Sequence, residues 1–174
     1  MSHVITHWFF ATKVITTFET GTASVPNINL RKGQDLAIKF SVGEGLFAKS
    51  ARAKYPSWGD SKGSIHVELY AWVGDYDDSL KAQPVAVTDW IDYSDNAHNK
   101  LTLDQPLPAG QYLMVMSIDP SKVTEMVGFY VKGHKEACMK VYVNGALQEN
   151  MELFHTFIHY VETPETTMWP ASGK

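Results

Sequence analysis

Six side chains combine aromatic rings or hydrogen-bonding groups with positions in loops or at a strand end: Trp58, Asp60, Trp72, Asp75, Tyr76 and Asn96. The C–H faces of sugar rings stack on Trp and Tyr, and sugar hydroxyls bond to carboxylate and amide groups. We therefore expect these residues to bind a glycan, with Trp58 and Tyr76 stacking on one sugar ring. The alternative for each tryptophan is partial burial as core or as a hydrophobic cap.

Acidic residues are frequent in the predicted turns, at Asp60, Asp75, Asp77, Asp78, Asp92 and Asp95. Aspartate favours turns because its side chain hydrogen-bonds to the nearby backbone, and this role explains most of the cluster. Loop carboxylates and carbonyls are also the oxygen ligands that Ca²⁺ prefers. A structural calcium ion is therefore the alternative, although the sequence has no EF-hand spacing.

The sequence identifies no catalytic residue and no metal ligand. It contains no nucleophile elbow, P-loop or dinucleotide-binding motif. Of the seven histidines, His155 and His159 are four residues apart in a predicted strand, which separates them by about 13 Å. A cupin-like metal site needs two histidines two residues apart, and His66 is followed by Glu68 instead.

The stretch that must position the aromatic groups is an alternating strand, predicted at residues 64–73. One face carries Ile65, Val67, Leu69, Ala71 and Val73, and the other carries His66, Glu68, Tyr70 and Trp72. Such alternation is typical of a half-buried strand. The second face either forms part of a ligand surface or is covered by another part of the same chain.

The remaining apolar runs predict an all-β fold. Turn residues recur every 8–12 residues or so, and no segment has convincing helical periodicity. We expect about ten strands in an antiparallel jelly-roll β-sandwich, including a central strand at 111–118 that is apolar on both faces. Residues 43–63 are predicted to form a long connection, in which residues 49–54 form either a helical turn or a short strand. Residues 1–163 are predicted to form one domain and residues 164–174 a tail or linker.

Composition limits the partners. The chain has 174 residues, enough for one domain, and a net charge of −4. It has no Lys/Arg block of the kind that binds nucleic acid, and no apolar stretch of about 18 residues that could span a membrane. Its one cysteine excludes an intramolecular disulfide. We expect an extracellular protein if a signal segment has been removed, and a cytoplasmic one otherwise.

Five stretches, taken together and in order, carry a resemblance to a known type of domain. They are ASVPNINLRKGQ (23–34), YPSWGDSKG (55–63), LYAWVGDY (69–76), PLPAGQYL (106–113) and VYVNG (141–145). The chain resembles the galactose-binding-like, or carbohydrate-binding-module-like, jelly-roll accessory domains of bacterial carbohydrate-active enzymes. The resemblance covers residues 20–163 or so, nearly the whole predicted domain.

The resemblance implies a non-catalytic domain, usually extracellular, that helps the catalytic domain of a larger enzyme to hold a glycan. Two alternatives stay open. One is a structural or assembly domain with no small ligand, whose aromatic faces bury against a partner. The other is a jelly-roll enzyme that acts on glycans, for which the sequence shows no convergent set of titratable groups.

Overall fold

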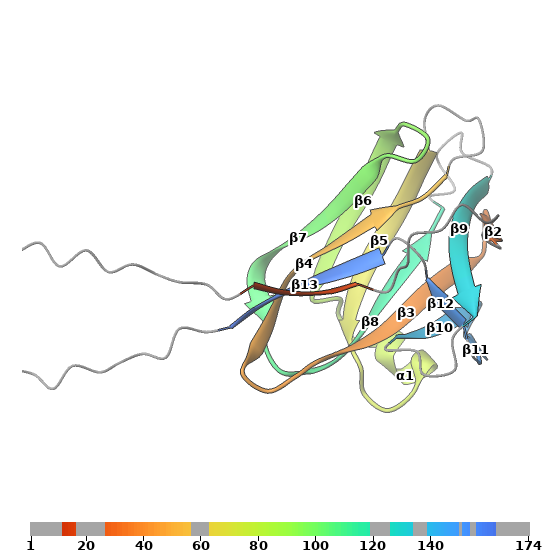
Figure 1. Cartoon of the computed structure of the whole chain (residues 1–174). Helices are drawn as coiled ribbons and strands as arrows, with labels where there is room; N and C mark the ends of the chain where they lie inside the picture. The colour runs from red at the N-terminus through yellow and green to blue at the C-terminus, as the bar shows by residue number, and fades with distance from the viewer. Residues whose placement is uncertain are drawn as a thin grey trace, which may run out of the picture.

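The chain folds into three antiparallel β-sheets and one short helix (Figure 1). The computed structural model describes residues 12–16, 27–56, 63–118, 126–133, 139–149, 151–153 and 156–162. The elements are β1 (Thr12–Thr16), β2 (Asn27–Arg31), β3 (Asp35–Val42), β4 (Leu46–Lys54), β5 (Gly63–Ala71), α1 (Tyr76–Leu80), β6 (Ala86–Tyr93), β7 (His98–Leu107), β8 (Gly110–Ser117), β9 (Met126–Gly133), β10 (Lys140–Val143), β11 (Ala146–Gln148), β12 (Met151–Leu153) and β13 (Thr156–Glu162). The predicted all-β class is confirmed.

Two of the sheets enclose the main core. The larger has six strands in the order β11-β10-β3-β8-β5-β6, and the second has four in the order β1-β13-β4-β7. Leu36 and Leu69 from the larger sheet pack in one buried cluster with Ala51, Leu101 and Ile158 from the smaller. The third sheet, β12-β9-β2, lies to one side, at the right of Figure 1. This arrangement confirms the predicted antiparallel sandwich, while the jelly-roll topology stays a prediction.

Strand β5 buries one of its two faces, and at Ile65, Val67 and Leu69 this is the apolar face that the alternation predicts. Ile65, Val67 and Leu69 are at most 2% exposed and point into the core between the sheets. Strand β8 pairs with β3 on one side and β5 on the other, as expected for the central strand that is apolar on both faces. Strands β5 and β8 therefore determine which of their side chains point out of the six-stranded sheet, away from the core.

Some predicted loops are strands in the structure. The connection predicted at 43–63 contains β4, whose buried side chains include Ala48, Ala51 and Ala53. Small alanines between charged residues give a weak hydrophobic pattern, so the sequence predicts at most a short strand at 49–54, as one of two alternatives, where β4 begins at Leu46. Strand β7 has ten residues, and β12 and β13 are two separate short strands near the end of the described chain. The described residues thus hold thirteen strands where about ten were expected.

Residues 164–174, predicted to be a tail or linker, lie outside the described residues, so the domain limits stay predictions. Within the described ranges, no helix has the length and apolar character that crossing a bilayer requires.

Candidate functional site

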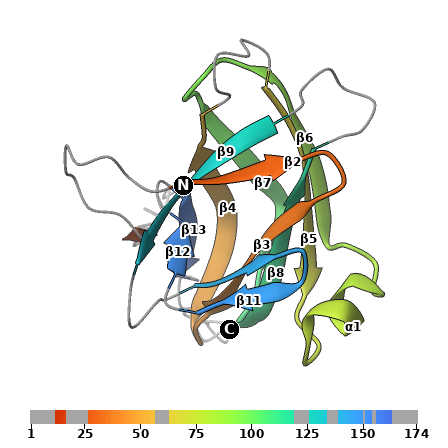
Figure 2. The ribbon, with the colours of Figure 1, turned by 90° about the vertical axis from the view of Figure 1, so that its right-hand side faces the viewer.

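The outer face of the six-stranded sheet carries a second apolar cluster, separate from the main core. It consists of Ala37, Tyr70, Tyr76, Leu113, Val115 and Tyr142, with Trp72 and Leu80 packed against it. Figure 2 shows α1 outside this sheet, on the side away from β4 and β13. Tyr70, near the end of β5 on its outer face, is therefore covered by the chain's own segment 76–80, whereas Trp72 remains partly exposed.

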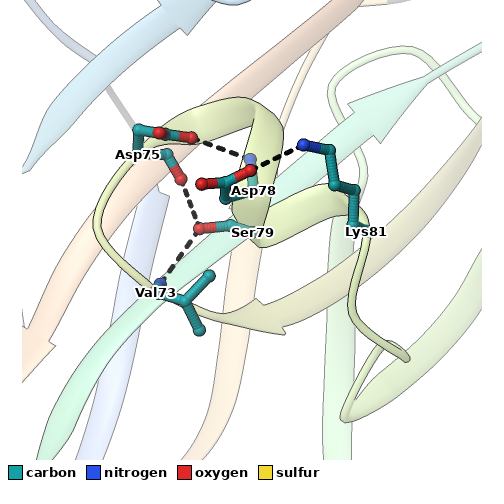
Figure 3. A network of polar contacts seen from close by, with 5 residues as sticks. All are labelled: Val73, Asp75, Asp78, Ser79 and Lys81. Carbon is teal, nitrogen blue, oxygen red and sulfur yellow. Dashed lines mark hydrogen bonds and ion pairs between the residues drawn. The ribbon is translucent and has the colours of Figure 1, made fainter.

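A local hydrogen-bond network fixes the segment that carries Trp72 and Tyr76 (Figure 3). Asp75 caps α1, because its Oδ1 accepts from the backbone N–H of Asp78 at 2.7 Å. The Ser79 hydroxyl donates to the carbonyl oxygen of Asp75 at 2.5 Å and accepts from the N–H of Val73 at 3.2 Å. The turn after β5 is thereby closed on itself, which fixes the direction of the chain between Trp72 and Tyr76.

Tyr76 anchors the segment to the sheet. Its hydroxyl donates to Asp35 Oδ1 at 2.5 Å, and its ring lies 5.3 Å from that of Tyr142. Burial raises the pKa of Tyr76, and the hydrogen bond to Asp35 raises it further. A Cβ on Gly145 would lie 3.4 Å from the Tyr76 ring, so the Asn144-Gly145 turn also packs closely on it. Only 8% of Tyr76 is exposed, so this ring supports its neighbours and offers no open face for stacking.

Beside this anchor lies a group that we call the aromatic rim: the partly exposed Lys39 and Trp72, the exposed Lys140, and the buried Tyr142 behind them. The ring centroids of Trp72 and Tyr142 are 6.0 Å apart. Lys39 places its Nζ 3.9 Å from the Trp72 ring centroid, a cation–π contact. The cross-strand partner of Lys39 in β10 is Lys140. The rim therefore joins an indole, a phenol ring and two ammonium groups on one face.

The environment of Lys39 disfavours its charge. Burial lowers the pKa of Lys39, and repulsion from Lys140 lowers it further. Among the described residues, the ion pairs within 4.0 Å are His66 with Glu68, His66 with Asp89, and Lys81 with Asp78. Neither lysine of the rim thus has a carboxylate partner in the described part of the chain.

A polar group lies farther along the same face. His66 Nδ1 is 2.7 Å from Asp89 Oδ1, and His66 Nε2 is 3.6 Å from Glu68 Oε1. Burial, followed by hydrogen bonding to Glu68, raises the pKa of Tyr70 to about 12. These carboxylates are therefore engaged with neighbouring side chains. In the described part of the chain, no three His, Cys, Asp or Glu residues are arranged to hold a metal ion.

The predicted site residues do not all come together. Trp72, Asp75 and Tyr76 follow the end of β5, whereas Asn96 lies in the turn after β6, where its N–H donates to the carbonyl oxygen of Tyr55. This turn adjoins the start of β5, because Gly63 pairs with Tyr93. The nine residues of β5, or about 30 Å, thus separate Asn96 from Trp72. Trp58 and Asp60 lie outside the described residues.

A groove of about 490 Å³ opens elsewhere, between the edge strands β6 and β7. Its lining includes Val85, Val87, Leu103 and Asp104. None of the described residues that line it is aromatic, so it offers no ring on which a sugar could stack. We therefore centre the candidate site on the aromatic rim, where stacking surface and charged groups coincide.

Sequence reasoning missed Lys39, Lys140 and Tyr142 as site residues. The alternation of Leu36, Ile38 and Phe40 does place Lys39 on the outer face of its strand. What the sequence lacked was the pairing of β3 with β10, which brings residues 101 positions apart into register as Lys39 and Lys140. Only the order of strands in the sheet reveals this neighbourhood.

Comparisons with known proteins show that this chain is similar in fold to solved structures. No protein-family profile matches the chain, and no curated protein matches it by sequence. Among solved structures, it is similar to the clostridial cysteine protease Cwp84 after propeptide cleavage, with 11% identity and a TM-score of 0.58. It is also similar to a structure of the cysteine protease and lectin-like domains of Cwp84, a surface layer associated protein of Clostridium difficile, with 9% identity and a TM-score of 0.58.

Both alignments cover 87% of this chain, but only 40% and 36% of those two structures. The chain thus spans about two fifths or less of the length of the proteins it resembles. At such low identity the likeness concerns the fold alone.

Proposed function

We propose that this protein is a non-catalytic carbohydrate-binding or accessory module that holds a glycan at the aromatic rim. The observation that carries the proposal is the position of Trp72: partly exposed, backed by Tyr142, and flanked by the ammonium group of Lys39. A ring edge or face beside fixed hydrogen-bond donors suits a sugar, which needs both apolar and polar contacts.

In this proposal each residue of the rim has a distinct role. Trp72 stacks on the C–H face of a sugar ring, and the Lys39 ammonium donates to oxygens at the edge of that ring. The exposed carboxylate of Asp75 keeps one oxygen for sugar hydroxyls, because its Oδ1 already accepts from Asp78. Tyr76 holds Tyr142 and the segment 72–80 in place. The affinity is modest, since each bond to a sugar replaces one to water at small net gain.

The fold comparisons are compatible with this function. One of the similar structures contains lectin-like domains, and both similar chains are longer than this one. The galactose-binding-like relationship, attachment to a larger enzyme and structural calcium all belong to the same proposal. Under this proposal, the activity to measure for this chain is the retention of a glycan.

The test is a glycan array, probed with and without calcium, followed by affinity measurements on two tryptophan variants. We expect Trp72→Ala to lose glycan retention while its melting temperature stays close to that of the parent protein. Ile91→Ala is the control, because Ile91 is 49% exposed and lies on β6, away from the rim. Trp58→Ala tests the other predicted stacking residue. If neither tryptophan variant loses retention, this assignment of the site is wrong.

One observation favours the second candidate, an assembly domain. Val85, Val87 and Ile91 are 47–52% exposed on or beside β6, which is the outer strand of its sheet. An exposed apolar edge strand can pair with another chain. The partner in this alternative is a second copy, whose β6 would pair antiparallel with the first.

Sedimentation velocity tests that alternative. A dimer that Val87→Lys converts to a monomer, and that Val73→Lys leaves intact, supports assembly through β6. Val73 is the matched control because it is 56% exposed but lies outside β6. A parent protein that stays monomeric at high concentration contradicts the alternative.

A further inference from the structure

The two lysines of the aromatic rim lie side by side on neighbouring strands. Lys39 in β3 is directly opposite Lys140 in β10. Directly opposite residues of an antiparallel pair have Cβ atoms about 5 Å apart, and like charges there are destabilising. An acidic residue in place of either lysine would replace this repulsion with attraction. The pair therefore calls for an explanation other than stability.

Three acidic groups of this face are engaged elsewhere, and Glu149, which follows the Gln148 paired with Val141, makes no ion pair with Lys140 in the described part of the chain. Asp35, on the same strand as Lys39, accepts a hydrogen bond from the hydroxyl of Tyr76. Glu68 lies 3.6 Å from His66, and Asp75 caps α1. The Lys39 ammonium lies over the indole of Trp72, which attracts the cation but cannot cancel its charge. The rim thus keeps two positive charges in a chain whose net charge is −4.

We propose that the aromatic rim binds an acidic glycan, with a carboxylate or sulfate group of the sugar held between Lys39 and Lys140. This inference rests on the proposed function and adds the class of sugar. An anion between the ammonium groups relieves their mutual repulsion, and charge-assisted hydrogen bonds to an anion are roughly twice as strong as neutral ones. Trp72 meanwhile supplies the apolar surface for the ring that carries the anion. A neutral sugar would leave the repulsion in place.

The experiment compares ligands that differ only in charge. Oligogalacturonate is titrated into the protein by calorimetry, and the same oligosaccharide with its carboxylates methyl-esterified serves as the neutral control. A sulfated galactan oligosaccharide forms the second anionic arm, which distinguishes sulfate from carboxylate. Each titration is run at low and at physiological salt, because exposed charge–charge interactions weaken as salt screens them.

We expect the acidic oligosaccharides to bind at least about tenfold more tightly than the ester, with the difference shrinking as salt is added. Lys39→Met and Lys140→Met keep most of the length of the side chain and remove its charge, and each should abolish most of this preference. Lys100→Met is the matched control, since Lys100 is exposed on β7 in the other sheet. Binding of the acidic ligand should also decline as the pH rises through the pKa of Lys39, which lies below its ordinary value.

The outcomes separate the two proposals. Equal binding of acid and ester, unaffected by salt or by the lysine variants, overturns this inference and leaves glycan binding standing. A preference for acid that Lys100→Met removes as effectively as Lys39→Met also overturns it. Failure of every glycan on the array and of all three oligosaccharides to bind overturns the proposed function itself.

Discussion

The two faces of the six-stranded sheet come from the same strands but differ in what holds them. On β5, Ile65, Val67 and Leu69 face the other sheet and pack in the dry core. The alternate residues, His66 and Glu68 among them, face outward and interact through ion pairs. The inner face therefore depends on burial of apolar surface, and the outer face on specific polar and aromatic contacts made by segments distant in sequence.

This difference assigns separate roles to the two faces. Changes on the inner face should act on the free energy of unfolding and hardly on ligand binding. Changes on the outer face should affect ligand binding more than the free energy of unfolding. The segment 72–80 and the aromatic rim bury less apolar surface, and their contacts fix the positions of the binding groups. Four substitutions test the distinction, from the largest expected effect on stability to the smallest.

The largest effect is expected from Leu69→Ala. Leu69 is 2% exposed in the main core, and truncation of a buried leucine costs about 2–5 kcal/mol through lost burial and the cavity it leaves. Leu147→Ala is the same substitution at a position that is 42% exposed on β11, and it should cost less than about 0.5 kcal/mol. Urea denaturation of both variants measures the difference. Equal losses would contradict the division between the faces.

Tyr76→Phe removes one hydrogen bond from the anchor on the outer face. The hydroxyl donates to the carboxylate of Asp35, and loss of such a bond should cost about 1–2 kcal/mol at this partly buried site. Tyr142→Phe is the control, because the Tyr142 ring packs in the same cluster and no hydrogen bond of its hydroxyl occurs among the described residues. Thermal melting should show a clear decrease for the first variant and almost none for the second.

Asp75→Ala removes the cap of α1 and should cost about 1 kcal/mol. Asp77→Ala, in the first turn of the same helix, removes an acidic side chain that does not cap it. The expected signature is a small loss of stability for the first variant, together with weaker ligand binding as Trp72 loses its fixed position. A cap variant that binds ligand like the parent would show that the segment 72–80 does not position the rim.

The smallest effect concerns pH. Burial alone lowers the pKa of His66, but the hydrogen bond and charge of Asp89, with the charge of Glu68, outweigh it and raise the pKa above 6.5. The stabilising contribution of His66 is therefore complete below pH 6.5 and is lost as the pH rises through the higher folded-state value. Because the His66 and Asp89 side chains are both partly exposed to solvent, which screens their interaction, the change should be about a few tenths of a kcal/mol. Melting curves recorded between pH 5 and 9 should show this pH-dependent change for the parent protein and not for His66→Gln.

The sequence predicts the inner face much better than the outer one. Alternation alone identifies the core positions of β3 and β5, and the apolar run at 111–118 identifies the central strand β8. By contrast, the sequence predicts a strand within β4 only as one of two alternatives, because its buried residues are alanines and a serine between charged side chains. The physical reason is that burial leaves a periodic mark in the sequence only where large apolar residues supply it.

The candidate site could be predicted only in part. Trp72, Asp75 and Tyr76 lie within five residues of one another, so their proximity is local and visible in the sequence. Asn96 also lies in a polar turn, but that turn connects β6 to β7 and adjoins the start of β5. Asn96 and Trp72 are therefore at opposite ends of β5. The neighbourhood of Lys39 and Lys140 depends on strand order, which no local pattern contains.

The most direct test of the account is an NMR titration that follows the indole N–H resonances with oligogalacturonate as ligand. We predict that the Trp72 indole resonance and the backbone amides of Lys39 and Lys140 shift together and saturate with one binding constant. The amides of β4 and β7, on the other sheet, should not move. Saturable shifts confined to the groove between β6 and β7, with Trp72 unchanged, would contradict the claim that the outer face of the six-stranded sheet binds the glycan.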